Sequence, residues 1–294
     1  MSQPEWSSDS VLYAEEGNCV KITLNQPEQL NALGAELVDA LHAALDRALG
    51  YESNSRSAQG TGSQGTGSQG TDSQGNTSRG NSSQGREDPV KLIVFQANGK
   101  GFSGGLDLSC LDTESDGDLL LRLVRIEQLL QRVRHASCAT AVFVHAACYG
   151  AAADLVLACR TRVAATDARF LMPGMRFGIV LGTRRLRDTL GEGAAYQLLD
   201  RLTPFKSDEA LATGFVSRIA EKANWPSIVD ETQLGLSGFS ARAYSHRVAS
   251  LTGDTRANDM QALVASIADG SIKARMRHYV ELVNTERQRR KQSG

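Results

Sequence analysis

One stretch, AVFVHAACYGAAADLVLACR from Ala141 to Arg160, constrains the fold of this chain more than any other. It begins with the apolar run 141–144, which is long enough for a buried strand and too short for a helix. A loop of small residues then ends at Gly150, and the apolar residues of 151–159 recur at helical spacing. The stretch therefore predicts a strand, a tight loop and the start of a helix.

The predicted helix start at Ala151 is a candidate site for a negatively charged oxygen. The first turn of a helix has unpaired backbone N–H groups and a positive partial charge. The small side chains before it would let a substrate approach the backbone closely. Because many α/β proteins contain an apolar strand followed by an alanine-rich helix, this pattern alone does not identify a function.

Composition excludes several classes of protein. Lysine and arginine total 32 against 33 aspartates and glutamates, so no charge excess favours nucleic acid or an anionic membrane. No segment approaches the ~18 apolar residues of a membrane span, and the first residues do not resemble a secretory signal. The five cysteines show no zinc-like pairing, which indicates free thiols and no metal site. We expect a soluble cytoplasmic protein.

The rest of the chain alternates predicted strands and helices. The runs VLYAEE and CVKITL flank Gly17-Asn18, which is typical of a hairpin, and an apolar stripe predicts a helix from about Gly34 to Leu49. The segment 90–96 predicts a buried strand, and leucines at helical spacing predict a helix over 119–133. Further short strands and helices follow, and the chain after about Trp225 is expected to be helical. This alternation indicates an α/β architecture.

A repetitive segment interrupts this pattern. Pentapeptides such as TGSQG repeat from Thr61 to Gly85, and the segment has no apolar residue after Ala58 to bury. Such a composition cannot offset the entropy of ordering, so we expect a disordered insert over 52–88. The insert separates the start of the core, residues 1–51, from the main part of the core, residues 89–222. A helical region, residues 223–294, follows the core.

A second loop of interest is ANGKGFSGGLDL, after the strand predicted at 90–96. Its glycines, among them Gly104 and Gly105, allow sharp turns and expose backbone amides, as in anion-binding loops.

Five segments, taken in order, resemble motifs of the crotonase (enoyl-CoA hydratase/isomerase) family. They are LNQPEQLNAL, GKGFSGGLDL, GAAADLVLACR, DARFLMPGMRFGIVLGTRRL and SDEALATGFVSRI. The match spans Val11 to Ile219 outside the repeat insert. Five motifs in the right order are far more specific than any one of them.

The resemblance implies a spiral of repeated ββα turns, with C-terminal helices that assemble homotrimers or hexamers. It implies an acyl-CoA substrate, as in fatty acid metabolism, with coenzyme A as part of the substrate and no separate cofactor. Residue by residue, the two backbone amides that grip the thioester oxygen fall on Gly104 and Ala151. The neighbouring Gly105 and Gly150 fall on the loops that contact the coenzyme A thioester.

The acid and base residues depart from the family pattern. The first family glutamate falls on Asp154 and the second on Gly174, which carries no side chain. Because hydration needs groups that activate water and protonate carbon, this loss argues against ordinary hydratase activity. Some dienoyl-CoA isomerases of the family carry aspartate at the first position. The segment VLGT also replaces a longer glycine-rich loop.

Two hypotheses follow. The first is an enzyme of the isomerase, lyase or hydrolase type that stabilises a thioester oxyanion, with Asp154 as its candidate base. The second is a non-catalytic family member that binds coenzyme A or acts as a scaffold. His145 either packs in its loop or acts as a base. Arg176 either binds a substrate carboxylate or is a solvated surface residue.

Overall fold

The computed structural model describes residues 6–50 and 89–292. The predicted repeat insert at 52–88 lies outside the described residues, and so do its boundaries with the core. No described helix is both long enough and apolar enough to cross a membrane.

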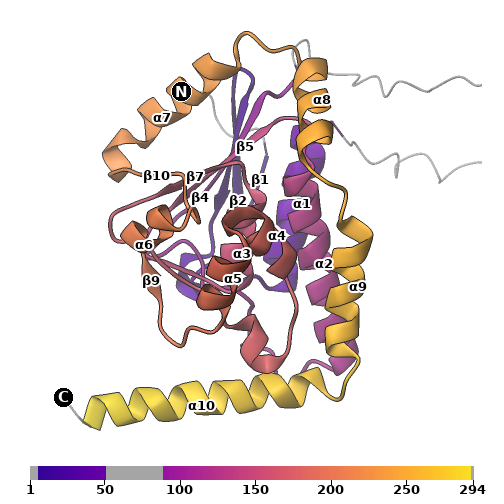
Figure 1. Cartoon of the computed structure of the whole chain (residues 1–294), viewed down its shortest axis with the longest axis vertical. Coiled ribbons are helices and arrows are strands. Elements are labelled where there is room, and N and C mark those ends of the chain that lie inside the picture. Colours follow the sequence, from indigo (N-terminus) through magenta and orange to yellow (C-terminus); the bar gives the residue numbers. More distant parts are fainter. Residues whose placement is uncertain (1–5, 51–88, 293–294) are drawn as a thin grey trace, which may run out of the picture.

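A sheet of seven strands, in the order β1-β2-β3-β4-β5-β7-β10, forms the centre of the molecule (Figure 1). The strands are β1 (Trp6–Ser8), β2 (Val11–Glu16), β3 (Cys19–Leu24), β4 (Leu92–Ala97), β5 (Ala139–Val144), β7 (Thr161–Ala164) and β10 (Arg218–Ile219). The first three strands are antiparallel, and pairing is parallel from β3 onward. The predicted hairpin and both predicted buried strands are confirmed.

The central strands are buried on both faces, which explains their continuous apolar sequences. In β4, Ile93 and Phe95 join the main core, whereas Leu92 and Val94 join a second core on the opposite face. All six residues of β5 are buried. The side chains alternate between the two faces because successive Cβ atoms of a strand point in opposite directions.

Three helices make the parallel connections and cover the main core. They are α1 (Ala35–Leu49), α2 (Asp116–Arg134) and α3 (Ala151–Ala158). The apolar stripe of α1 is buried, and a reciprocal capping box between Ser115 and Asp118 begins α2. All eight residues of α3 are buried. The three helices agree with the predicted ones.

A smaller sheet contains β6 (Ala147–Tyr149), β8 (Arg169–Leu171) and β9 (Phe205–Lys206). Helix α6 (Ser207–Ala212) contacts β8 and β9, and α4 (Thr183–Leu190) packs against α5 (Glu192–Leu199) and α3. Short 3-10 helices occur at η1 (Pro27–Gln29), η2 (Pro173–Phe177) and η3 (Lys222–Asn224). The sequence pattern did not predict β6 or α4, because β6 is very short and α4 buries only two of its eight residues.

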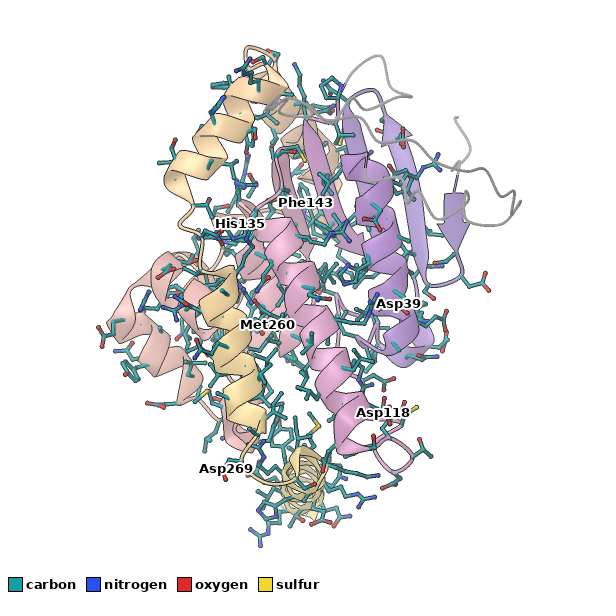
Figure 2. The ribbon with its side chains drawn as sticks, turned by 90° about the vertical axis from the view of Figure 1, so that its right-hand side faces the viewer. Asp39, Asp118, His135, Phe143, Met260 and Asp269 are labelled. Carbon is teal, nitrogen blue, oxygen red and sulfur yellow. The ribbon has the colours of Figure 1, made fainter. Side chains whose placement is uncertain are left out.

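The last part of the chain is helical, as predicted. Its helices are α7 (Trp225–Leu236), α8 (Ala241–Leu251), α9 (Arg256–Ile267) and α10 (Ile272–Gln292). Helix α9, which carries Met260, lies beside α2, and α10 crosses beneath both (Figure 2). Leu263 of α9 and Met276 of α10 are fully buried in a third core with residues of α2 and η2. The parallel core and the C-terminal helices confirm the predicted α/β architecture.

Candidate active site

The two glycine- and alanine-lined loops singled out in the sequence lie against each other. The Ser103 amide donates to the Ala147 carbonyl, and the Tyr149 amide donates to the Ser103 carbonyl, each at 3.1 Å. Gly105 has a φ of +88°, and a methyl group there would overlap the carbonyl oxygen of Tyr149. Glycine at 105 therefore lets the two backbones approach closely.

The amide of Gly104 is already occupied. It donates to the carbonyl of Leu30 at 2.8 Å, although Gly104 borders the cavity described below. Because an amide carries a single hydrogen, this bond leaves Gly104 no N–H for a substrate oxygen. The assignment of an oxyanion amide to Gly104 is therefore corrected. The amides of Gly105 and Gly150 are also occupied, by Ser103 Oγ at 3.1 Å and by the Leu171 carbonyl at 2.8 Å respectively.

The Leu106 amide of this loop is free. Leu106 forms a parallel bridge with Leu33, in which the bonds come from the flanking Gly105 carbonyl and Asp107 amide. In such a bridge the middle residue directs its own N–H away from its partner. The Leu106 amide has no acceptor among the described residues, and Leu106 borders the cavity.

Ala151 presents a second free amide. It is the first residue of α3, so its N–H has no acceptor within the helix. Gly150, the N-cap, offers no side chain for capping and has a φ of +54°. Ala151 is 5% exposed and borders the same cavity as Leu106. The structure thus confirms the predicted helix start at Ala151 and places it at a cavity.

Asp154 lies one helical turn after Ala151, so the two residues share a face of α3, with Cβ atoms roughly 5–6 Å apart. Its side chain borders the cavity but is only 3% exposed, and its Oδ1 has no hydrogen-bond partner among the described residues. Burial raises the pKa of Asp154 to about 8, while Arg185 lowers it and Glu127 raises it.

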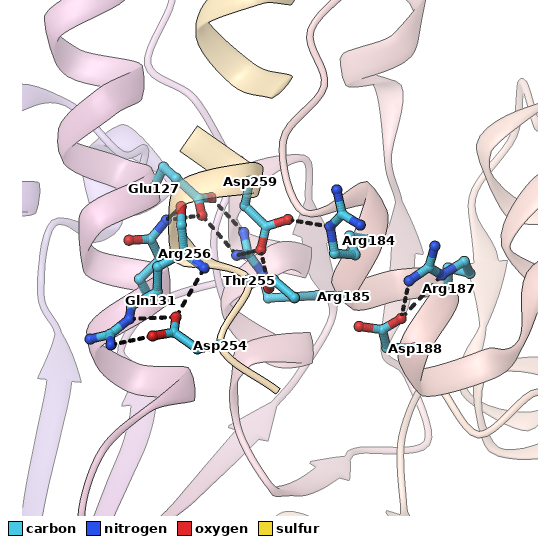
Figure 3. A network of polar contacts seen from close by, with 10 residues as sticks. All are labelled: Glu127, Gln131, Arg184, Arg185, Arg187, Asp188, Asp254, Thr255, Arg256 and Asp259. Atoms are coloured by element: carbon cyan, nitrogen blue, oxygen red, sulfur yellow. Dashed lines mark hydrogen bonds and ion pairs between the residues drawn. The ribbon is translucent and has the colours of Figure 1, made fainter. Parts of the chain in front are cut away.

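Glu127 and Arg185 form a buried ion pair near Asp154. The guanidinium Nη1 and Nη2 of Arg185 donate to Glu127 Oε1 and Oε2 at 2.9 and 2.6 Å (Figure 3). Asp259 of α9 extends the network. Its Oδ2 lies 3.7 Å from Arg185 Nη1, and its Oδ1 accepts from Arg184 Nε at 2.8 Å. The network joins α2, α4 and α9, and α4 begins beside Asp154.

The start of α4 contacts Asp154 directly. Gly182, the residue before the helix, has a φ of +67°, and a methyl group there would overlap Asp154 Oδ1. The next residue, Thr183, borders the cavity, and its buried Oγ1 has no hydrogen-bond partner among the described residues. Two unpaired oxygens therefore lie in one wall of the cavity.

The cavity has a volume of about 560 Å³. Its walls are mainly apolar and include Leu108, Leu123, Phe177, Ile179, Leu181 and Val280. One wall comes from α10, whose Tyr279 packs its ring 5.0 Å from the ring of Phe177. A cavity of this size, with a few polar groups in an apolar lining, suits a small organic ligand.

Other candidates from the sequence occupy different places. Gly174 borders the cavity without a side chain, and Arg176 borders it as an exposed residue. His145 is buried and outside the cavity lining, with its Nε2 3.0 Å from the Gly99 carbonyl oxygen, which agrees with a packing role.

Sequence reasoning missed Leu106, Thr183 and the wall from α10. Leu106 lies two residues beyond the predicted donor on the same loop, and the alternation of N–H directions along extended backbone was the available signal. No local pattern marked Thr183, because its position depends on how α4 meets α3. The cavity wall from α10 exists because α10 packs against α2 and η2 in the third core.

Comparisons of the sequence and the fold with known proteins identify the family of this chain. The enoyl-CoA hydratase/isomerase family model matches residues 83–232. A crystal structure from Bordetella parapertussis with the same family description is 34% identical, with a TM-score of 0.78, over 93% of this chain and 99% of that chain. The chain belongs to the enoyl-CoA hydratase/isomerase family, that is, the crotonase superfamily.

Individual relatives differ in their reactions. A probable enoyl-CoA hydratase of Bacillus subtilis is 29% identical over 182 residues, which are 57% of this chain and 70% of the relative. A human mitochondrial Delta(3,5)-Delta(2,4)-dienoyl-CoA isomerase is 29% identical over 151 residues, which are 46% of this chain and 45% of the relative.

Proposed function

We propose that this protein binds an acyl-CoA thioester and moves a proton next to its carbonyl group, as an isomerase does. The observation that carries the proposal is one cavity bordered by two free amides, of Leu106 and Ala151, and by the buried carboxyl of Asp154. Preorganised amides stabilise a developing oxyanion, and one such donor is typically worth about 10²–10³ in rate.

In the proposed reaction, ionised Asp154 accepts a proton from the α-carbon of a β,γ-unsaturated acyl group. The C–H electron pair becomes a carbon–carbon double bond, and the carbonyl π pair moves to the thioester oxygen beside the two amides. Return of the proton at the γ-carbon restores the carbonyl and shifts the double bond, with no atom gained or lost. Only one acid/base group is needed, so the absence of a side chain at Gly174 is not an obstacle.

A pKa of about 8 suits this role. A general base works best when its pKa lies near the working pH, because it is then both available and strong enough. The rate should rise as Asp154 ionises toward about pH 8, and it should level off above that.

Solvent exchange tests the proposal without knowledge of the natural acyl group. The protein is incubated in deuterated water with saturated and β,γ-unsaturated acyl-CoA thioesters, and mass spectrometry measures deuterium gained by the thioester. Asp154→Asn should lose exchange by at least about 10²-fold. Asp200→Asn, an exposed aspartate after α5, is the matched control.

The second hypothesis, a non-catalytic scaffold that binds coenzyme A, rests on Gly174. Titration calorimetry with coenzyme A and acyl-CoA thioesters separates the two hypotheses when it is combined with the exchange assay. Binding without exchange on any thioester favours the scaffold, whereas Asp154-dependent exchange excludes it. The expected homotrimer or hexamer stays a prediction, which light scattering after size-exclusion chromatography would test.

A further inference from the structure

Two buried oxygens of the cavity wall, Asp154 Oδ1 and Thr183 Oγ1, lack hydrogen-bond partners among the described residues. Buried polar atoms of native proteins nearly always have a partner, so each exception asks for an explanation. Both residues border the cavity, and they come from different helices, α3 and α4. Two such atoms in one wall point to a function for both.

The backbone brings the two side chains to the same place. Asp154 Oδ1 lies against Gly182, where a methyl group would overlap it, and Thr183 is the next residue. Gly182 adopts a left-handed conformation with a φ of +67° at the start of α4. The Asp154 carboxyl therefore contacts Gly182, the residue directly before Thr183.

The charged neighbours do not supply a hydrogen bond to Asp154. The Nη1 and Nη2 atoms of Arg185, on α4, are engaged by Glu127, on α2. The Cys148 thiol, on β6, is fully buried, and burial together with Asp154 keeps its pKa well above the usual value. A hydroxyl either donates to a carboxylate or accepts from a carboxylic acid, so Thr183 suits both protonation states.

We propose that Thr183 is a positioning residue, whose hydroxyl orients the Asp154 carboxyl toward the acyl group during proton transfer. This inference rests on the proposed function of Asp154 as the base. The two oxygens do not bond to each other in the structure, and the proposed bond forms when the acyl group is bound. Ionised Asp154 then accepts from the Thr183 hydroxyl, and Asp154 that holds the substrate proton donates to it. The hydroxyl thus takes part in orientation and never exchanges a proton with the substrate.

The test compares Thr183→Val, which removes the hydroxyl at nearly constant volume, with Thr183→Ser, which keeps it. In the deuterium-exchange assay we expect Thr183→Val to lower kcat by about 10–10²-fold, as for a displaced catalytic group, with little change in KM. Its pH profile should move upward, because a donor to the ionised carboxylate has been lost. Thr183→Ser should keep kcat and the pH profile close to those of the wild type.

Thr189→Val is the matched control, since Thr189 is a threonine of the same helix that lies outside the cavity lining and donates to the Arg185 carbonyl at 2.7 Å. Thermal melts check that each variant folds, and Thr183→Ala replaces Thr183→Val if the valine variant does not. An unchanged kcat and pH profile in the hydroxyl-free variant would overturn the inference. A serine variant as impaired as the valine variant would overturn it as well.

The two proposals fail in different ways. Loss of exchange in Asp154→Asn together with normal exchange in Thr183→Val removes only the role of Thr183. Normal exchange in Asp154→Asn removes the proposed function, and the role of Thr183 with it.

Discussion

Replacing Gly105 with alanine should destabilise the protein by forcing the two active-site loops apart. Gly105 has a φ of +88°, and a left-handed conformation costs an L-residue about 1–2 kcal/mol. The added methyl would also overlap the Tyr149 carbonyl oxygen and lie 3.1 Å from its carbon. Because this neighbour is backbone, it cannot rotate away, and overpacking of this kind costs about 1–3 kcal/mol.

Together the two effects predict a loss of about 2–5 kcal/mol in the free energy of unfolding. For a chain of this size, each kcal/mol lowers Tm by about 2–4 °C, so Tm should fall by about 4–20 °C. Urea denaturation followed by circular dichroism measures the free energy, and a thermal melt measures Tm.

Gly104→Ala is the matched control for stability. Gly104 has no positive φ, and the nearest atom to an added methyl would be Leu30 Cβ at 3.7 Å, an ordinary contact. We expect a change within about 0.5 kcal/mol. If the two variants are equally stable, or if alanine at 105 costs nothing, the argument that the loops meet at Gly105 is refuted.

Three further predictions concern the buried charges and thiols. Glu127→Gln leaves Arg185 without its counter-charge and should cost about 3–5 kcal/mol in urea denaturation, whereas the double variant with Arg185→Met should recover part of this loss. Burial raises the pKa of Asp154 from 3.8 to about 8, so between these values the folded chain holds a proton that the unfolded chain lacks. The wild type should therefore lose stability relative to Asp154→Asn as pH rises from about 4 to about 8, by up to about 1.4 kcal/mol per pH unit, and a flat difference would contradict the burial of the carboxyl. Cys110 is the one exposed cysteine of the five, so a thiol reagent should modify it rapidly in the native protein and reach the others only after denaturation.

Much of the fold could be predicted because its signals are local. The hairpin before Leu24, the helix after Gly34 and the strand–loop–helix at Ala141–Arg160 each follow from side-chain periodicity and turn residues. The weakly patterned elements β6 and α4 were missed because a short strand and a mostly polar helix carry little apolar periodicity.

Part of the candidate site could be predicted from local features. The helix start at Ala151 and the residue one turn later, Asp154, are such features, and the structure places both at one cavity, while their catalytic roles stay predictions. Gly104 was chosen wrongly because its amide bonds to Leu30, more than seventy residues earlier in the chain. Which amide of a loop remains free depends on its partner segment, and the loop sequence alone does not reveal that partner.

The sequence by itself determined the family, the alternation of strands and helices, and the two loops that meet. Only the tertiary structure decided that the Leu106 amide is free, that Asp154 is buried with a raised pKa, and that Thr183 lies beside it. The physical reason is that periodicity and turns act between near neighbours. Hydrogen-bond partners, burial and electrostatic environment are instead set by segments that the fold brings together from distant parts of the chain.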